Sequence, residues 1–141
     1  MANRKSSFDT GIAAEYFVLS QLHRLGVEAY LSQGNTNAID IRVVHPNGRG
    51  ISIDVKAVRG YSSLVVNNVV PKKDHFLAFV VYNDKFEQLD TFPSVYIVPS
   101  TAVPEITKVF GKERRVMKGS LAPYLNGWKS LQANITIEAD T

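Results

Sequence analysis

The chain of 141 residues is long enough for one domain with a real core, and its 45% apolar and 21% charged residues are typical of a globular rather than a disordered protein. It has no cysteine, which excludes disulfides and thiolate zinc sites, and its net charge of +3 permits a polyanionic partner without requiring one. The N-terminal segment lacks the apolar run of a signal peptide, and no stretch reaches the ~20 apolar residues of a membrane helix, so we expect a soluble, cytoplasmic protein with no membrane partner.

The first predicted element is a helix over residues 7–25, with Ser7 or Asp9 as its cap and Gly26 as its terminator. At ~100° per residue, Glu15 is expected near the middle of the apolar stripe of this helix, which is an unusual place for a carboxylate. The stripe consists of Ile12, Val18, Leu19, Leu22 and Leu25.

A β-hairpin is predicted over residues 38–58, after a short strand at 27–31. In its second strand, ISIDVKAV (51–58), apolar residues occupy every second position, which indicates a strand with one buried face. The first strand, 38–44, alternates in the same way. The segment between the two strands contains Pro46 and Asn-Gly, which are typical of a turn.

Beyond the hairpin, residues 61–70 are predicted to form an irregular strand or a loop that crosses the sheet. The nearly continuous apolar run 75–82 indicates a central strand covered on both faces, and 94–99 indicates another strand. A short helix is predicted over 100–111, and one or two further helical turns over 121–133. No repeat, low-complexity tract or linker divides the sequence, so we expect one domain over residues 1–141.

Four ionisable residues stand out against this framework. Asp40 is on the polar face of the first hairpin strand, and Asp54 and Lys56 are on the same face of the second. If the preceding helix packs on this face, Glu15 joins them. Carboxylates so close together repel one another and are poorly solvated, a cost that a divalent cation such as Mg2+ relieves. Lys56 could then hold a water or stabilise charge on a phosphate.

A simpler interpretation needs no metal. Asp54 and Lys56 could form a surface ion pair, which is worth ~0–1 kcal/mol. Glu15 could be an exposed helix residue if the apolar stripe is narrower than predicted.

The order of a helical Glu, an Asp, a turn and an Asp-x-Lys resembles the PD-(D/E)XK nuclease superfamily, in the segments GIAAEYFVLSQLHRLG, NAIDIRV and ISIDVKAV. The resemblance covers about residues 8–82 and is greatest to small Holliday-junction resolvases and intron-encoded endonucleases. It implies an α/β fold with a restriction-endonuclease-like core, in which a central mixed β-sheet is flanked by helices in an αβββαβ-like order. Ile39 stands where the motif has proline, and Asp54 replaces the more frequent glutamate.

The resemblance also implies a function, that of a Mg2+-dependent endonuclease hydrolysing phosphodiester bonds in DNA, with Mn2+ as a possible substitute. Asp40 and Asp54 would be metal ligands, Lys56 the catalytic lysine, and Glu15 an auxiliary ligand or a group behind the ligands. Two alternatives keep the fold: a structure-selective junction resolvase and a non-catalytic nucleic-acid-binding module. Symmetric cutting of two strands needs a two-fold dimer, so we expect a homodimer with DNA as its partner.

Basic residues outside the motif are candidates for binding DNA phosphates, although such residues are more often solvated surface. The densest basic run is at 112–118. His23 and His75 are expected to be structural or exposed. The candidates for contact with DNA are Arg42, Arg59, Lys72, Lys73, Arg114 and Arg115.

Overall fold

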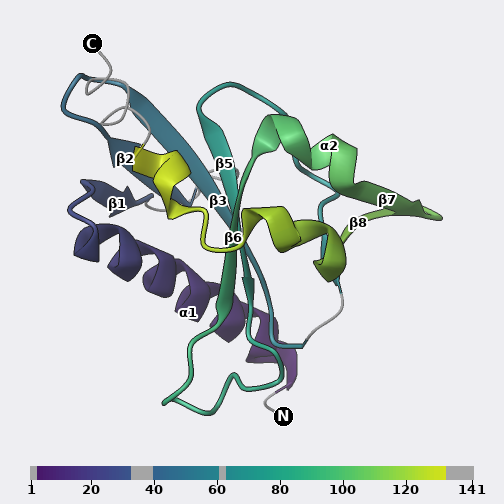
Figure 1. Cartoon of the computed structure of the whole chain (residues 1–141). Helices are drawn as coiled ribbons and strands as arrows, with labels where there is room; N and C mark the ends of the chain where they lie inside the picture. The colour runs from purple at the N-terminus through teal and green to yellow at the C-terminus, as the bar shows by residue number, and fades with distance from the viewer. Residues whose placement is uncertain (1–2, 33–39, 61–62, 133–141) are drawn as a thin grey trace.

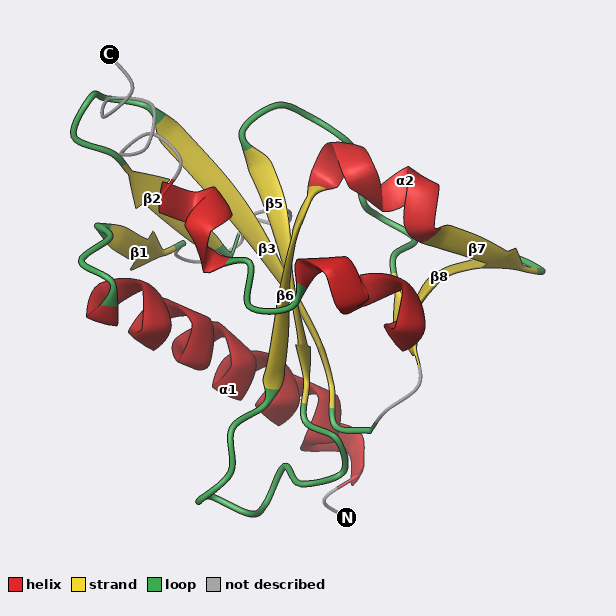
Figure 2. Ribbon diagram, viewed as in Figure 1, coloured by secondary structure: helices red, strands yellow, loops and turns green. Residues whose placement is uncertain are grey.

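A central sheet of five strands organises the fold (Figures 1 and 2). The computed structural model describes residues 3–32, 40–60 and 63–132. The sheet is mixed, because β3 and β5 pair in parallel whereas its other neighbouring strands pair antiparallel. In spatial order it consists of β1 (Ala29–Leu31), β2 (Ile41–Val44), β3 (Gly50–Val58), β5 (His75–Val81) and β6 (Ser94–Pro99). The predicted α/β class with a central mixed sheet is therefore confirmed.

Helix α1 (Asn3–Arg24) precedes the sheet and begins earlier than the predicted caps at Ser7 and Asp9. The helix ends at Arg24, just before the predicted terminator Gly26, whose φ of 76° favours glycine. The amide of Val27 donates to the carbonyl of Leu22 and that of Gly26 to the carbonyl of His23, both at 3.0 Å. This pair of hydrogen bonds is a Schellman motif, and it satisfies carbonyls at the end of the helix.

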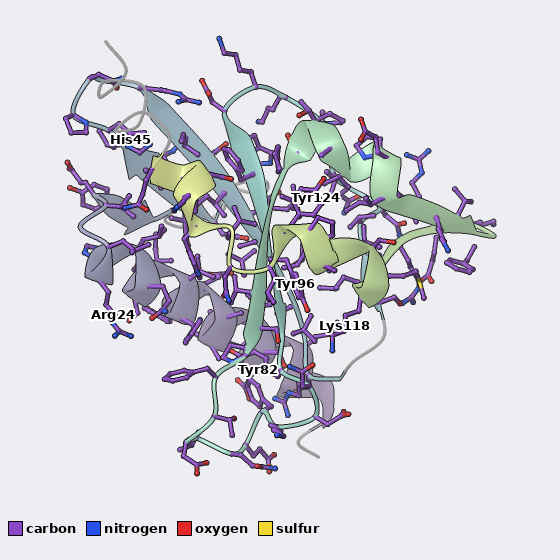
Figure 3. All side chains as sticks on the ribbon, in the orientation of Figure 1. Arg24, His45, Tyr82, Tyr96, Lys118 and Tyr124 are labelled. Atoms are coloured by element: carbon purple, nitrogen blue, oxygen red, sulfur yellow. The ribbon has the colours of Figure 1, made fainter. Side chains whose placement is uncertain are left out.

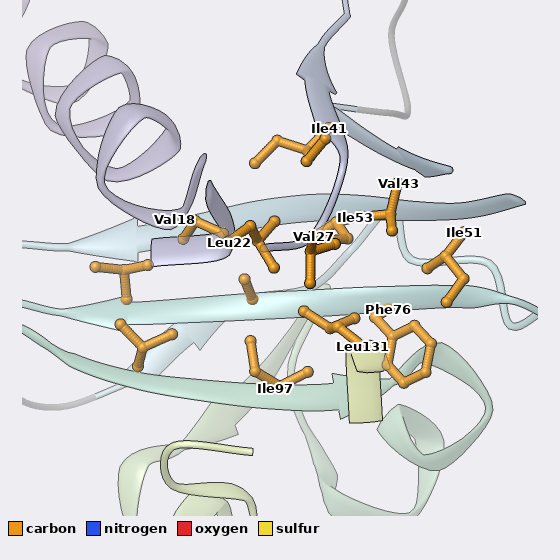
Figure 4. Packing of buried hydrophobic residues seen from close by; sticks show 14 of the residues in the cluster. Val18, Leu22, Val27, Ile41, Val43, Ile51, Ile53, Phe76, Ile97 and Leu131 are labelled. Atoms are coloured by element: carbon orange, nitrogen blue, oxygen red, sulfur yellow. The ribbon is translucent and has the colours of Figure 1, made fainter. Parts of the chain in front are cut away.

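The main hydrophobic core lies between α1 and one face of the sheet (Figure 4). Ala14, Val18 and Leu22 are fully buried and follow one another at intervals of four residues along the helix. They pack against the apolar side chains of the hairpin, such as Ile41 and Ile53. The expectation that the helix packs on the polar face of the hairpin is therefore wrong, because the alternating apolar residues are what the helix buries.

The opposite face of the sheet is covered in part by a smaller antiparallel sheet of order β4-β8-β7 and by short helices (Figure 1). A second core forms there, in which Leu77 and Phe79 of β5 pack against Leu64, Val116 and Leu121. The covering elements are β4 (Ser63–Val65), β7 (Thr107–Phe110), β8 (Glu113–Met117), α2 (Val103–Ile106) and the 3₁₀-helices η1 (Ser100–Ala102) and η2 (Lys118–Tyr124).

Strand β5 is buried along its whole length, since both cores use its side chains. This confirms the predicted central strand at 75–82, and β6 has the bounds predicted for it. Of the predicted strand 38–44, residues 38 and 39 lie outside the described residues. The uncertain segment 61–70 contributes the three-residue strand β4, and η2 and η3 (Trp128–Gln132) supply the predicted helical turns.

The helix predicted over 100–111 is wrong in its second half. Only Ser100–Ala102 and Val103–Ile106 are helical, and the chain then extends into β7. Strand β7 pairs with β8, so tertiary pairing outweighs the local capping pattern. Gly111 has a φ of 63° and lies in the turn of this hairpin instead of ending a helix.

Candidate active site

Strand β3 presents Asp54 and Lys56 on the face of the sheet opposite α1. Its alternation sends Ile51 and Ile53 into the core under the helix, so the residues between and beyond them face the other way. The side chain of Asp54 is only 14% exposed, and Lys56 is half-buried. An ionisable pair is thus placed on an apolar sheet near the edge of the second core.

Asp40 stands where β2 begins, directly beside β3. Its amide donates to the carbonyl of Ile53 at 2.9 Å, and its Oδ2 accepts from the amide of Val55 at 2.7 Å. The carboxylate thus accepts a hydrogen bond that a backbone carbonyl of the neighbouring strand would otherwise accept. The regular register of β2 with β3 begins with Ile41 opposite Ile53, and Asp40 precedes it with its Oδ2 at the amide that follows Asp54.

The pKa of Asp54 is also affected by the nearby charge of Asp40. Burial, and next to it the charge of Asp40, raise the pKa of Asp54 to about 6, although Lys56 and Lys72 act to lower it. Like charges opposite each other in a sheet are destabilising. The two aspartates therefore form an electrostatically strained pair that a bound cation would relieve.

Glu15 approaches this pair from the helix. It lies beside the buried stripe of α1 and is half-buried, so the expectation that it lies in the middle of the stripe is wrong. Burial, and then the charge of Asp40, raise the pKa of Glu15. Asp40 is the common neighbour, since its charge acts on both Glu15 and Asp54. Asp40 is thus the electrostatic link between the two other predicted carboxylates, at the start of β2.

This set of donors suits one kind of metal site. Within residues 3–32, 40–60 and 63–132, no group of three or more His, Asp or Glu side chains is arranged to hold an ion on its own. Mg2+ is usually bound by one or two protein carboxylates and keeps several waters, whereas a closed protein cage is typical of other ions. Asp40 and Asp54 fit the first arrangement.

Ser52 and His75 lie near Asp54, although the sequence did not assign them to the site. His75 is 4% exposed, its Nδ1 lies 2.6 Å from Ser52 Oγ, and its Nε2 lies 3.6 Å from Asp54 Oδ2. Burial, followed by the charge of Lys72, lowers the pKa of His75. In the sequence, the only indication of this role is that His75 is a polar residue at the start of the apolar run 75–82. Only the parallel pairing of Ser52 with His75 brings the imidazole to β3.

Three of the basic candidates lie on the side of the site. The charge of Lys72 acts on Asp54, and Lys73 is its exposed neighbour. The backbone of Lys72 is fixed by the fully buried Ser100, whose Oγ accepts from the Lys72 amide and donates to its carbonyl, both at 2.9 Å. Arg42 is exposed and pairs in register with Ser52, so it shares the face of Asp54.

The other basic candidates make their contacts with residues outside the site. Arg59 lies at the far end of β3, where its Nε donates to Thr10 Oγ1 at 2.7 Å and its guanidinium lies 3.9 Å from the ring centre of Phe86. Arg114 and Arg115 belong to β8, and Arg115 forms an ion pair with Glu113 at 2.9 Å.

Lys118, at the end of the basic run, has a structural contact of its own. Its Nζ donates to Asn83 Oδ1 at 2.9 Å, which links η2 to the loop after β5 (Figure 3). Lys118 follows the last residue of β8 and is the first residue of η2, so this contact does not belong to the β7–β8 hairpin.

No protein-family model matches the chain, and no curated protein matches it in sequence. Among solved structures, the fold is similar to that of a bacterial homing endonuclease, I-Ssp6803I, with a TM-score of 0.61 and 14% sequence identity. The alignment covers 94% of this chain and 96% of the other, so the likeness extends over both. At this identity it shows a shared fold, a mixed sheet flanked by helices. In the described part of the chain, no helix has the length and hydropathy to cross a bilayer.

Proposed function

We propose that this chain is a metal-dependent endonuclease of the PD-(D/E)XK type that hydrolyses phosphodiester bonds in DNA. The observation that carries the proposal is the closeness of two aspartates: Asp40 Oδ2 accepts from the amide of Val55, the residue after Asp54, and burial together with the charge of Asp40 raises the pKa of Asp54 to about 6. Lys56 lies on the same face of β3. The fold shared with a bacterial homing endonuclease supports the same class of activity.

Each residue has a role in this proposal. Asp40 and Asp54 would hold Mg2+, or Mn2+ in its place, and Glu15 would support the ion from the side of Asp40. When bound, the ion polarises the phosphate and lowers the pKa of the attacking water. The ammonium of Lys56 orients that water or stabilises the charge that develops on the phosphate. Lys72 adds a second positive charge near Asp54.

The alternative of a plain surface ion pair is not favoured by the contacts of Asp54. Among the described residues, Asp54 and Lys56 form no ion pair with each other, and the side chain that Asp54 meets is the imidazole of His75, at 3.6 Å. A side chain that is 14% exposed is also too buried for a solvated surface pair. The position of Asp54 makes better sense when a cation offsets its repulsion from Asp40.

A DNA-binding surface is proposed on the same side of the sheet. Residues 107–117 contain four Lys or Arg and one Glu, a net charge of +3, which equals that of the whole chain. They form the β7–β8 hairpin, which projects from the body on the side opposite α1 (Figures 1 and 2). Near its turn, Val109 is 68% and Phe110 50% exposed. A two-stranded ribbon of this kind fits the major groove of duplex DNA.

The test is cleavage of labelled duplex, single-stranded and four-way-junction DNA with Mg2+, Mn2+ or chelator, followed on denaturing gels. We expect cutting that requires the metal and is lost in Asp54→Ala, with the exposed loop variant Asp90→Ala as the matched control. Preference for the junction would identify a resolvase. Full cutting by Asp54→Ala, or binding of DNA without cutting any substrate, would contradict the proposal, and the second result would favour a non-catalytic module.

A further inference from the structure

Two polar side chains are buried next to Asp54 and have no part in the proposed chemistry. Ser52 is 9% exposed and His75 4%, and both lie on the face of the sheet that carries Asp54. Buried polar groups are costly unless they are hydrogen-bonded, so their arrangement calls for an explanation.

The three side chains form a connected series. Ser52 Oγ and His75 Nδ1 are 2.6 Å apart, and His75 Nε2 faces Asp54 Oδ2 at 3.6 Å. A neutral imidazole has one N–H donor and one acceptor nitrogen, so it can join a hydroxyl on one side to a carboxylate on the other. When that proton is on Nε2, toward the carboxylate, Ser52 O–H donates to Nδ1. A shift of about half an ångström would bring the Nε2–Oδ2 distance into the range of a hydrogen bond.

The series is not a nucleophilic triad. In a Ser-His-Asp triad the serine hydrogen-bonds to Nε2 and the aspartate to Nδ1, whereas here the order is reversed. Ser52 is also buried, so no substrate reaches its Oγ. The imidazole is instead placed to act on Asp54.

We infer that His75, held in place by Ser52, is a positioning residue that fixes Oδ2 of Asp54 and so leaves the other carboxylate oxygen directed at the cation. Such a support matters because Asp54 is subject to opposing forces, repulsion by Asp40 and attraction by Lys56 and Lys72. Groups that hydrogen-bond to metal ligands usually contribute 10–100-fold, as an order of magnitude, to metal affinity or activity. The inference rests on the proposed function, since it takes Asp54 as a ligand of the metal.

The test is Mn2+ binding by calorimetry to the full chain and three variants, each checked for folding by its melting temperature. We expect His75→Leu to weaken Mn2+ binding by about 10–100-fold, and His75→Gln, which can still donate to Asp54, to recover part of the loss. The Mg2+ concentration for half-maximal cleavage should rise in parallel, while the Kd for DNA in Ca2+ stays unchanged. His23→Gln is the matched control, because His23 contacts Ala29 O, outside the site.

A folded His75→Leu protein that binds Mn2+ as tightly as the wild type would overturn the inference and leave the proposed function intact. A wild-type protein that binds no Mn2+ would overturn both. If His75→Leu does not fold, Ser52→Ala gives the same test, because it releases the imidazole without altering it. We expect a several-fold weaker Mn2+ affinity in this variant, and an unchanged affinity would contradict the inference.

Discussion

In the metal-free protein, the ionised carboxylate of Asp54 is destabilised by burial and by the charge of Asp40. The stability of the folded protein therefore depends on pH. The folded-state pKa of Asp54 is raised from 3.8 to about 6, so the folded state binds more protons than the unfolded state between these values. The contribution of Asp54 to stability is therefore greatest below pH 3.8 and is lost as the pH rises through about 6.

We predict that Asp54→Asn stabilises the metal-free protein at pH 8, by an amount on the order of 1–2 kcal/mol, because the neutral amide removes the cost of burying a charge and the repulsion from Asp40. Near pH 4 the two proteins should differ little. Urea unfolding at both pH values, in the presence of chelator, measures the difference. An Asp54→Asn protein that is less stable than the wild type at pH 8 would show that the repulsion is not significant.

Lys56 is predicted to act in the chemical step rather than in folding. It is half-buried on β3, and among the described residues it takes part in none of the ion pairs. Lys56→Ala should lower kcat by about 10²–10⁴-fold at saturating Mg2+, with little change in melting temperature. Single-turnover cleavage compares it with Lys85→Ala, which alters an exposed loop lysine. Equal rates for the two variants would exclude a catalytic role.

At the scale of elements, the β7–β8 hairpin is predicted to bind DNA through phosphates. Removing one phosphate contact reduces the slope of log K against log salt concentration by about 0.9. Lys112→Ala and Arg114→Ala should each produce a change of this order in Ca2+, where DNA is bound but not cut. Lys129→Ala is the control, because η3 packs toward the core under α1. If the slope of log K against log salt concentration is unchanged in both hairpin variants, the hairpin does not bind the DNA phosphates.

Much of the element order could be predicted from local pattern. The alternation in ISIDVKAV identified β3 and the face of Asp54 and Lys56, and the continuous apolar run identified β5. Gly26 could be recognised as a helix terminator because a positive φ favours glycine. These features depend on residues that are close in the sequence, so they could be predicted from the sequence alone.

Other features depend on pairing between distant segments and could not be read from the sequence. Strand β7 forms because β8 pairs with it, although the residues before it carry a helical capping pattern. His75 belongs to the site only because β5 runs parallel to β3, with Ser52 opposite it. The charge of Asp40 acts on Glu15 although α1 packs on the apolar face of the sheet, and no local pattern in the sequence indicates this.

At the scale of the whole molecule, one chain supplies one pair of aspartates, so symmetric cutting of both DNA strands requires two copies. We predict that the complex with duplex DNA in Ca2+ contains two chains of 15.6 kDa, as measured by analytical ultracentrifugation. A complex with one chain that cuts both strands in a single binding event would contradict the predicted dimer.

The central claim is that Asp40 and Asp54 together hold a divalent cation. Electron paramagnetic resonance of Mn2+ measures it most directly, because free Mn2+ gives a strong signal that weakens when the ion binds. We predict that the wild-type protein removes free Mn2+ from solution at pH 8 and that Asp40→Asn combined with Asp54→Asn abolishes this binding. Equal binding by the wild type and the double variant would contradict the account.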